Sequence, residues 1–120
     1  MDWRVKHIIR VIEENHRGEF SEQAMSRSVN LSPSRLRDLF KKETGLSPMR
    51  YVRRLRLKKA ETLLRTSFLS IKEVIFQSGA GDASHFVRAF KKEYGVTPSA
   101  FRAQAGFTSK TFTGAVKTGD

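Results

Sequence analysis

The 120-residue sequence contains no cysteine, and this absence removes several classes of protein at once. Without a thiol the chain has no disulfide scaffold, no thiolate zinc site, no iron–sulfur cluster and no cysteine nucleophile. It also lacks an apolar run of the roughly 20 residues that a spanning helix needs, and its first residues contain no signal-peptide core. We therefore expect a cytoplasmic protein that is not inserted into a membrane.

Signals for β-strands are missing as well, and prolines are few. Alternating apolar and polar stretches are absent, and so are the Asn-Gly and Asp-Gly pairs typical of tight hairpins.

The three prolines all follow a hydroxyl residue, in Ser32-Pro33, Ser47-Pro48 and Thr97-Pro98. A Ser or Thr side chain caps the first backbone N–H groups of a helix, and Pro is tolerated at the next position. Each pair therefore predicts the start of a helix.

Other residues predict further helix limits. Asp82 suits an N-cap, and Ser70 with Glu73 fits a reciprocal capping box. Helix ends are expected at glycines that follow polar last turns, namely Gly18, Gly45 and Gly95.

Between these limits apolar residues recur at helical spacing. The pattern predicts an all-α chain of seven helices, at about 3–16, 21–29, 33–44, 48–65, 71–78, 83–94 and from 98. The first helix has one apolar stripe, formed by Val5, Ile8, Ile9 and Ile12. The long fourth helix is expected to bury Val52, Leu55, Ala60, Leu63 and Leu64.

The chain contains an internal repeat. The segment 40–48, Phe-Lys-Lys-Glu-Thr-Gly-Leu-Ser-Pro, returns at 90–98 with six of nine residues identical. Upstream, Ser21 and Asn30 align with Ser70 and Gly79, at a spacing of 49 residues and not 50, which predicts one extra residue in the second turn. Because Asn and Gly tolerate a left-handed backbone, both copies predict a helix, a tight turn and a second helix.

With these features the sequence resembles the AraC/XylS family of bacterial transcription regulators, whose DNA-binding region carries two helix-turn-helix units joined by a long helix. The resemblance rests on residues 29–36 and 39–45, the stretch 51–64, and residues 82–86 and 88–92 with the closing Gly95-Val96-Thr97-Pro98 pattern. It implies a DNA-binding domain over residues 1–104, with units at about 3–46 and 70–104 and a linker helix at about 48–65. The remainder, 105–120, is expected to be a flexible tail.

Three positions depart from the family pattern. The family usually has Ala early in the first helix of the second unit, and an apolar residue followed by Gly-Phe at its turn. Here those places hold Ile75, Ser78, Gly79 and Ala80. One larger and two smaller side chains are expected to compensate in volume.

The first unit supplies one set of candidate base contacts, which the resemblance maps onto Ser34, Arg37 and Asp38. Together with Lys41 these residues share one helical face. Arg contacts a guanine edge with two hydrogen bonds, and Asp accepts from cytosine N4. An alternative role for Asp38 is an ion pair with Arg35 or Lys42 on the helix surface.

The second unit presents Ala83, Ser84 and Arg88 at its corresponding face. Ala83 suits a thymine methyl group, Ser84 suits either kind of base, and Arg88 is the one strong candidate for base recognition. His85 is expected either to contact a phosphate or to be a half-buried helix residue.

The net charge of +11, from 23 Lys and Arg against 12 Asp and Glu, favours an anionic partner. Expected contacts with the DNA backbone are Ser32, Arg35, Lys41, Arg50, Arg54, His85 and Lys91. The linker helix is rich in Arg and Lys around its whole circumference, so about half of its cations are expected to face solvent. Its roughly 27 Å length predicts two contacted DNA segments about one turn apart, with some bending.

Other functions fit less well. Asp82, Ser84 and His85 have the residue types of a hydrolase triad, but side chains within one helical turn fan outwards and cannot align in series. The three histidines lie in different elements, and no phosphate-binding glycine loop is present. We therefore expect no enzyme, no metal and no cofactor. The alternative kept open is a nonspecific basic nucleic-acid-binding or architectural module.

The expected partner is double-stranded DNA, with RNA polymerase left open as a second partner and no membrane. As this fragment the chain is expected to be monomeric, and dimerisation is left to a domain outside these residues.

Overall fold

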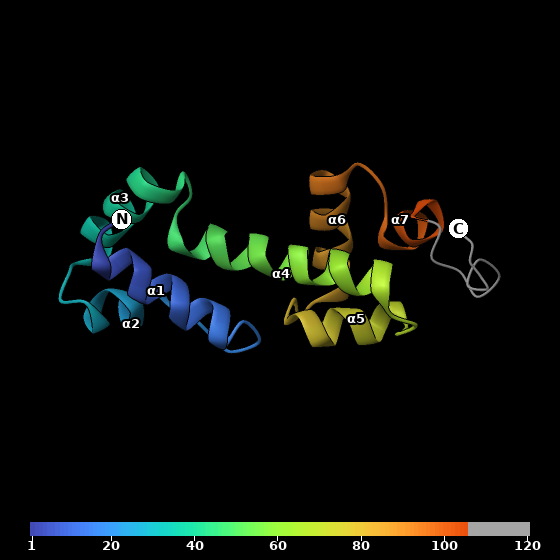
Figure 1. Ribbon diagram of the computed structural model, residues 1–120, viewed down its shortest axis with the longest axis horizontal. Coiled ribbons are helices and arrows are strands. Elements are labelled where there is room, and N and C mark those ends of the chain that lie inside the picture. The colour runs from blue at the N-terminus through green and yellow to red at the C-terminus, as the bar shows by residue number, and fades with distance from the viewer. Residues whose placement is uncertain (106–120) are drawn as a thin grey trace. The chain divides into compact units, whose positions relative to one another are not determined.

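The computed structural model describes residues 1–105, and within this range all regular secondary structure is helical. Figure 1 shows the seven helices in chain order, namely α1 (Trp3–Glu14), α2 (Glu22–Ser28), α3 (Pro33–Thr44), α4 (Pro48–Thr66), α5 (Ile71–Ser78), α6 (Ala83–Tyr94) and α7 (Pro98–Gln104). The predicted all-α class is confirmed. The predicted tail lies outside the described residues except for Ala105. No helix in the described range is both long and apolar enough to cross a membrane.

The helices begin where hydroxyl and carboxylate caps predict. Ser32 and Thr97 accept the main-chain N–H groups of Arg35 and Ala100, each at 3.2 Å. The Ser70–Glu73 box is complete, with the Glu73 N–H donating to Ser70 Oγ at 3.1 Å and the Ser70 N–H donating to the Glu73 carboxylate at 2.8 Å. The hydrogen bond from the Ser70 main chain to the carboxylate is the main cause that lowers the pKa of Glu73 below its usual value. Local capping chemistry therefore sets the helix starts.

Two of the three predicted glycine ends are confirmed, and the third is wrong. Gly45 and Gly95 end α3 and α6 with φ of 84°, in the left-handed region that favours glycine. In contrast, α1 ends at Glu14, and Asn15 is its C-cap with φ of −138°. The Asn15 N–H pairs with the Val11 and Ile12 carbonyls and closes the last turn of α1. The helix therefore ends at Glu14, four residues before Gly18.

The tight turns of the two repeats differ as the sequence spacing predicts. In the first, Asn30 takes the left-handed conformation with φ of 59°. In the second, Gly79 takes it with φ of 83°, and Gly81 has φ of 81° as well. The extra residue of the second copy is therefore accommodated between Gly79 and α6, where a second glycine permits another left-handed step.

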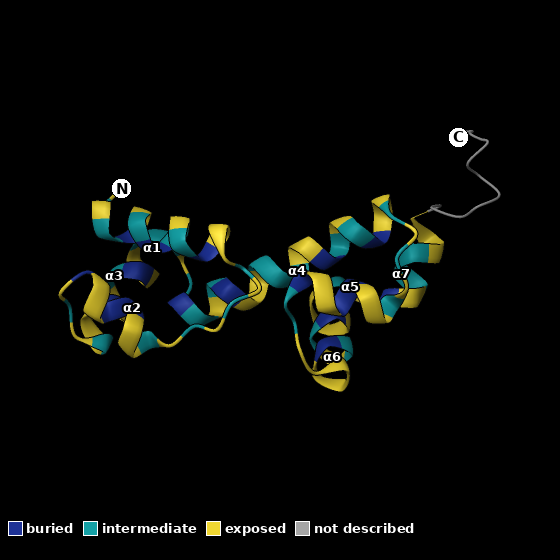
Figure 2. Ribbon diagram, turned by 90° about the horizontal axis from the view of Figure 1, so that it is seen from below, coloured by how far each residue is buried: buried dark blue, intermediate teal, exposed yellow. Residues whose placement is uncertain are grey.

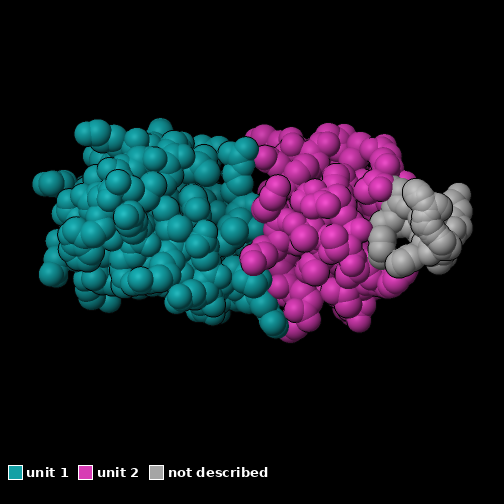
Figure 3. Space-filling model, viewed as in Figure 1, with its two compact units in different colours: residues 1–56 teal, residues 57–120 magenta. Residues whose placement is uncertain are grey.

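The chain forms two compact units, coloured separately in Figure 3. The first unit comprises Met1–Arg56, and the second begins at Leu57. The boundary falls inside α4, so the first part of this helix packs in one unit and the rest in the other. Each unit has its own hydrophobic core.

In the first unit the core lies between α1, α2, α3 and the start of α4, where the buried positions appear dark blue in Figure 2. Its buried members are Val5, Ile8, Ile12, Met25, Val29, Leu36, Phe40 and Val52. Phe40 packs edge-on against Tyr51 of α4 at 5.4 Å between ring centroids. These contacts hold α3 against α1 and α2 and leave its opposite face exposed.

In the second unit α4 takes the place that α1 has in the first. The buried members are Ala60, Leu64, Val74, Ile75, Phe86 and Phe90, and Phe101 of α7 packs edge-on against Phe90. The unusual pair Ile75 and Ser78 is almost fully buried here, and Ser78 Oγ donates to the Ile75 carbonyl at 3.0 Å. The aligned pair in the first unit is Ser26 and Val29. The large and small side chains have exchanged places between the two units, so each core contains one β-branched apolar residue and one serine at this pair of positions.

Candidate nucleic-acid interface

In the first unit α2, the turn at Asn30 and α3 form a helix-turn-helix. Leu36 and Phe40 anchor α3 in the core, and Leu39 is half-buried. The opposite face of α3 carries the predicted contact residues, all exposed, namely Ser32, Ser34, Arg35, Arg37, Asp38 and Lys41. The helix therefore presents a polar face with three cations and one carboxylate, and a polar helical face of this kind suits major-groove recognition.

Arg37 is not a free side chain on this face. Its Nη1 donates to Glu22 Oε1 at 2.8 Å, which joins the second turn of α3 to the first turn of α2. The Arg37 side chain is 46% exposed and that of Glu22 is 27% exposed. Sequence reasoning missed Glu22, because its partner lies 15 residues away on another helix.

Asp38 has no ion pair to Arg35 or Lys42 within residues 1–105. Its carboxylate is exposed on the same face as Ser34. Ser32 Oγ, the cap of α3, lies 3.5 Å from Ser34 Oγ. The first turn of α3 therefore offers hydroxyl groups that both donate and accept hydrogen bonds, next to one acceptor carboxylate.

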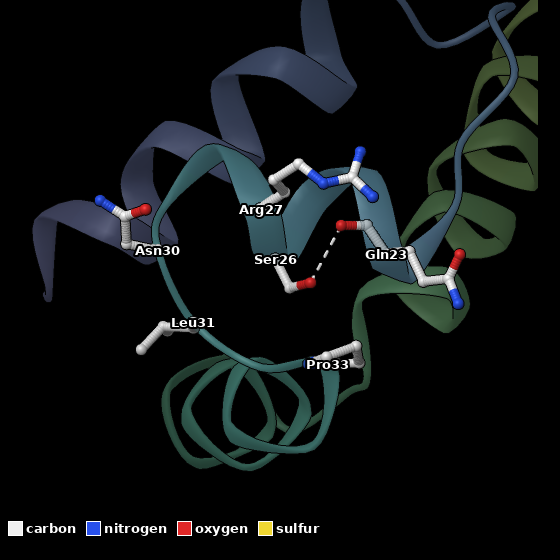
Figure 4. Close-up of a pocket in the computed structure, with 6 residues that line it drawn as sticks. All are labelled: Gln23, Ser26, Arg27, Asn30, Leu31 and Pro33. Atoms are coloured by element: carbon white, nitrogen blue, oxygen red, sulfur yellow. Dashed lines mark hydrogen bonds between the residues drawn. The ribbon is translucent and has the colours of Figure 1, made fainter.

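A shallow hollow of about 580 Å³ lies beside this turn, and Figure 4 shows its lining. It is formed by Gln23, Ser26, Arg27, Asn30, Leu31 and Pro33. The Ser26 hydroxyl is committed to the Gln23 carbonyl at 3.0 Å. The hollow thus follows the junction between α2 and the start of α3.

In the second unit Phe86 and Phe90 anchor α6 in the same way. The predicted residues Ala83, Ser84, His85, Arg88 and Lys91 are all exposed. His85 is thus on the surface and not half-buried.

The Asp82 carboxylate is committed to the start of α6. It accepts the His85 main-chain N–H at 3.1 Å, and this hydrogen bond holds the pKa of Asp82 below its usual value. The Asp82 carboxylate therefore caps the main chain of α6 through the His85 N–H, and its hydrogen bond is not to the His85 ring.

The basic stretch of α4 divides into exposed and internal cations. Arg50, Arg53 and Arg54 are exposed, as are Lys58 and Lys59. Arg56 is half-buried, and its guanidinium donates to the main-chain carbonyls of His16 and Gly18. Burial lowers the pKa of Arg56. This cation is used to hold the segment after α1 and is not available to a ligand.

Arg102 of α7 has the corresponding role in the second unit. It donates to the Leu64 carbonyl at 3.1 Å and to the Ser67 carbonyl at 3.3 Å, at the end of α4. Each unit thus uses one arginine to satisfy main-chain carbonyl groups at or just after the end of its first helix. Among residues 1–105 no cluster of three or more His, Cys, Asp and Glu could hold a metal ion.

Comparison with known proteins agrees with this architecture. A family model described as a helix-turn-helix domain matches residues 25–104. The transcriptional activator RhaS of Escherichia fergusonii is 38% identical over 101 residues, which cover 84% of this chain and 36% of that protein. The transcriptional regulator MtrA of Neisseria gonorrhoeae is 33% identical over 105 residues, covering 88% and 35%. The chain therefore spans about a third of the length of these relatives.

Solved structures show the same fold. The C-terminal domain of the two-component response regulator yesN from Fusobacterium nucleatum has a TM-score of 0.74 and 34% identity, covering 81% of this chain and 95% of that one. The DNA-binding domain of AdpA, solved in complex with a target DNA, has a TM-score of 0.79 at 23% identity, covering 84% and 91%. The two units thus define a double helix-turn-helix domain. The chain belongs to the AraC/XylS family of helix-turn-helix transcription regulators.

Proposed function

We propose that this chain binds double-stranded DNA in a sequence-specific manner, with α3 and α6 placed in successive major grooves, and that it regulates transcription. One observation carries the proposal. In each unit the second helix of the helix-turn-helix is anchored by two core residues and exposes the opposite face. A helix held in this way positions its side chains against base edges without losing much conformational freedom on binding.

The side chains divide into two kinds of contact. We assign base contacts to Ser34, Arg37, Asp38, Ala83, Ser84 and Arg88, which occupy the first two turns of the two helices. Backbone contacts are assigned to Ser32, Arg35, Lys41, Arg50, Arg54, His85 and Lys91. This division follows the general pattern in which phosphate contacts position a protein and base contacts specify the site.

The test is selection from a random duplex library at near-physiological salt, with transfer RNA and anionic vesicles as competitors. We expect an enriched, asymmetric motif with two conserved segments about one helical turn apart. Competitors should displace the protein from random duplexes but not from the enriched one. A pool without any motif would overturn the proposal and favour a nonspecific architectural module.

A further inference from the structure

We propose that Glu22 is a specificity-determining residue that positions Arg37 for base recognition without touching DNA itself. This inference rests on the proposed function. Its first support is the ion pair at 2.8 Å between Arg37 Nη1 and Glu22 Oε1. A guanidinium has five N–H donors, so one bond to Glu22 leaves the others available for a guanine.

The ion pair with Glu22 restrains the Arg37 side chain but leaves it accessible to solvent. Arg37 is 46% exposed although it is paired, so the carboxylate restrains the guanidinium and does not bury it. An unrestrained arginine samples many rotamers and reaches phosphates as easily as base edges. Fixing one end lowers the entropy lost on binding and directs the remaining donors to one position.

The internal repeat provides an independent comparison. The positions that align with Glu22 and Arg37 in the second unit are Ile71 and Val87. Both are half-buried and pack against the second core. In the second unit, α5 and α6 are therefore joined at these two positions by apolar packing. Apolar packing is a simpler way to stabilise the pair of helices than an ion pair.

Stability is a weak reason for the charged pair in the first unit. Ion pairs between partly exposed side chains contribute little to folding. A carboxylate on the binding side of the unit also repels DNA phosphates, so it lowers nonspecific affinity. A residue that costs nonspecific affinity and adds little stability is best explained by discrimination between sequences.

The experiment repeats the library selection with Glu22→Ala, Arg37→Ala and the double variant. Glu19→Ala is the matched control, because Glu19 is an exposed acid of the same unit. We expect Glu22→Ala to lose about 3- to 10-fold of discrimination at the single base position that Arg37→Ala also relaxes. Its nonspecific affinity should equal or exceed that of the wild type. The double variant should give the same motif as Arg37→Ala alone.

The control variant Glu19→Ala should raise the nonspecific affinity for DNA without altering the selected motif. An unchanged motif for Glu22→Ala, or a loss spread over all positions together with a lower thermal midpoint, would overturn the positioning role. A wild-type protein that selects no motif would overturn the proposed function itself, so the two failures are distinguishable.

Discussion

The Nε atom of Arg56 donates a hydrogen bond to the main-chain carbonyl of His16 at 2.8 Å, across 40 residues of sequence. A second guanidinium nitrogen donates to the Gly18 carbonyl, and the charge lies 5.8 Å from the centroid of the Phe20 ring. One planar group therefore joins α4 to the segment that follows α1. Part of the +11 charge is thus internal structure and does not contribute to the binding surface.

Replacing Arg56 with Lys should destabilise the first unit. Lysine carries its three N–H donors on one nitrogen, whereas Arg56 uses two separate nitrogens, so at least one half-buried carbonyl loses its partner. We expect the free energy of unfolding to fall by about 1 to 3 kcal/mol, measured by denaturant titration. The matched control Arg53→Lys changes an exposed cation and should leave it unchanged. A variant that keeps full stability but loses DNA affinity would contradict this role.

Arg102 provides the equivalent prediction for the second unit. Removing its guanidinium in Arg102→Lys frees the carbonyls of Leu64 and Ser67, so the last turn of α4 should open more often. Hydrogen exchange should become faster over residues 57–105 and stay unchanged in α1 to α3. The exposed Gln104→Ala in the same helix serves as the control. Uniformly faster exchange in both units would argue against a local role for Arg102.

Local signals in the sequence were sufficient for most of the fold. The starts of α3, α5, α6 and α7 follow from side chains that cap the backbone within three residues, and such short-range chemistry is visible without a structure. The left-handed residues Asn30 and Gly79 were predictable for the same reason. The end of α1 was not, because Asn15 breaks the helix before the expected glycine.

The contacts that the sequence did not reveal are long-range. Arg56 and Arg102 bind carbonyl groups 35 to 40 residues away, and main-chain carbonyls have no residue-specific signature. The Arg37 partner Glu22 was missed likewise, since only the packing of α2 on α3 brings it near. Exposure of the candidate contact residues followed from helical periodicity, whereas their partners required the three-dimensional structure.

Acid should weaken the start of α6 through Asp82. Its pKa is held below the ordinary 3.8, first by the hydrogen bond from the His85 main chain. The stabilisation is therefore complete above pH 3.8 and is lost as the pH falls through the lower, folded-state pKa. We expect the thermal midpoint of the wild type to fall more steeply than that of Asp82→Asn below this pH. Parallel curves would show that the Asp82 charge is not coupled to folding.

The salt dependence of DNA binding should separate phosphate contacts from other cations. The single variants Lys41→Gln and Lys91→Gln should each reduce the slope of log affinity against log salt concentration by about 0.9. Arg65→Gln should leave the slope nearly unchanged, because Arg65 lies in the last turn of α4, is not among the assigned backbone contacts and pairs with Glu61 at 2.7 Å. An equal change for all three variants would mean that the charge acts only as a diffuse field.

The most direct test of the central claim compares Arg37→Ala and Arg88→Ala with the wild type on the selected duplex and on all its single-base variants. Each substitution should cost about 1 to 3 kcal/mol and relax one base position. The two relaxed positions should lie about one helical turn apart, one for each recognition helix. A uniform loss of affinity across all sequences in both variants would contradict sequence-specific recognition by α3 and α6.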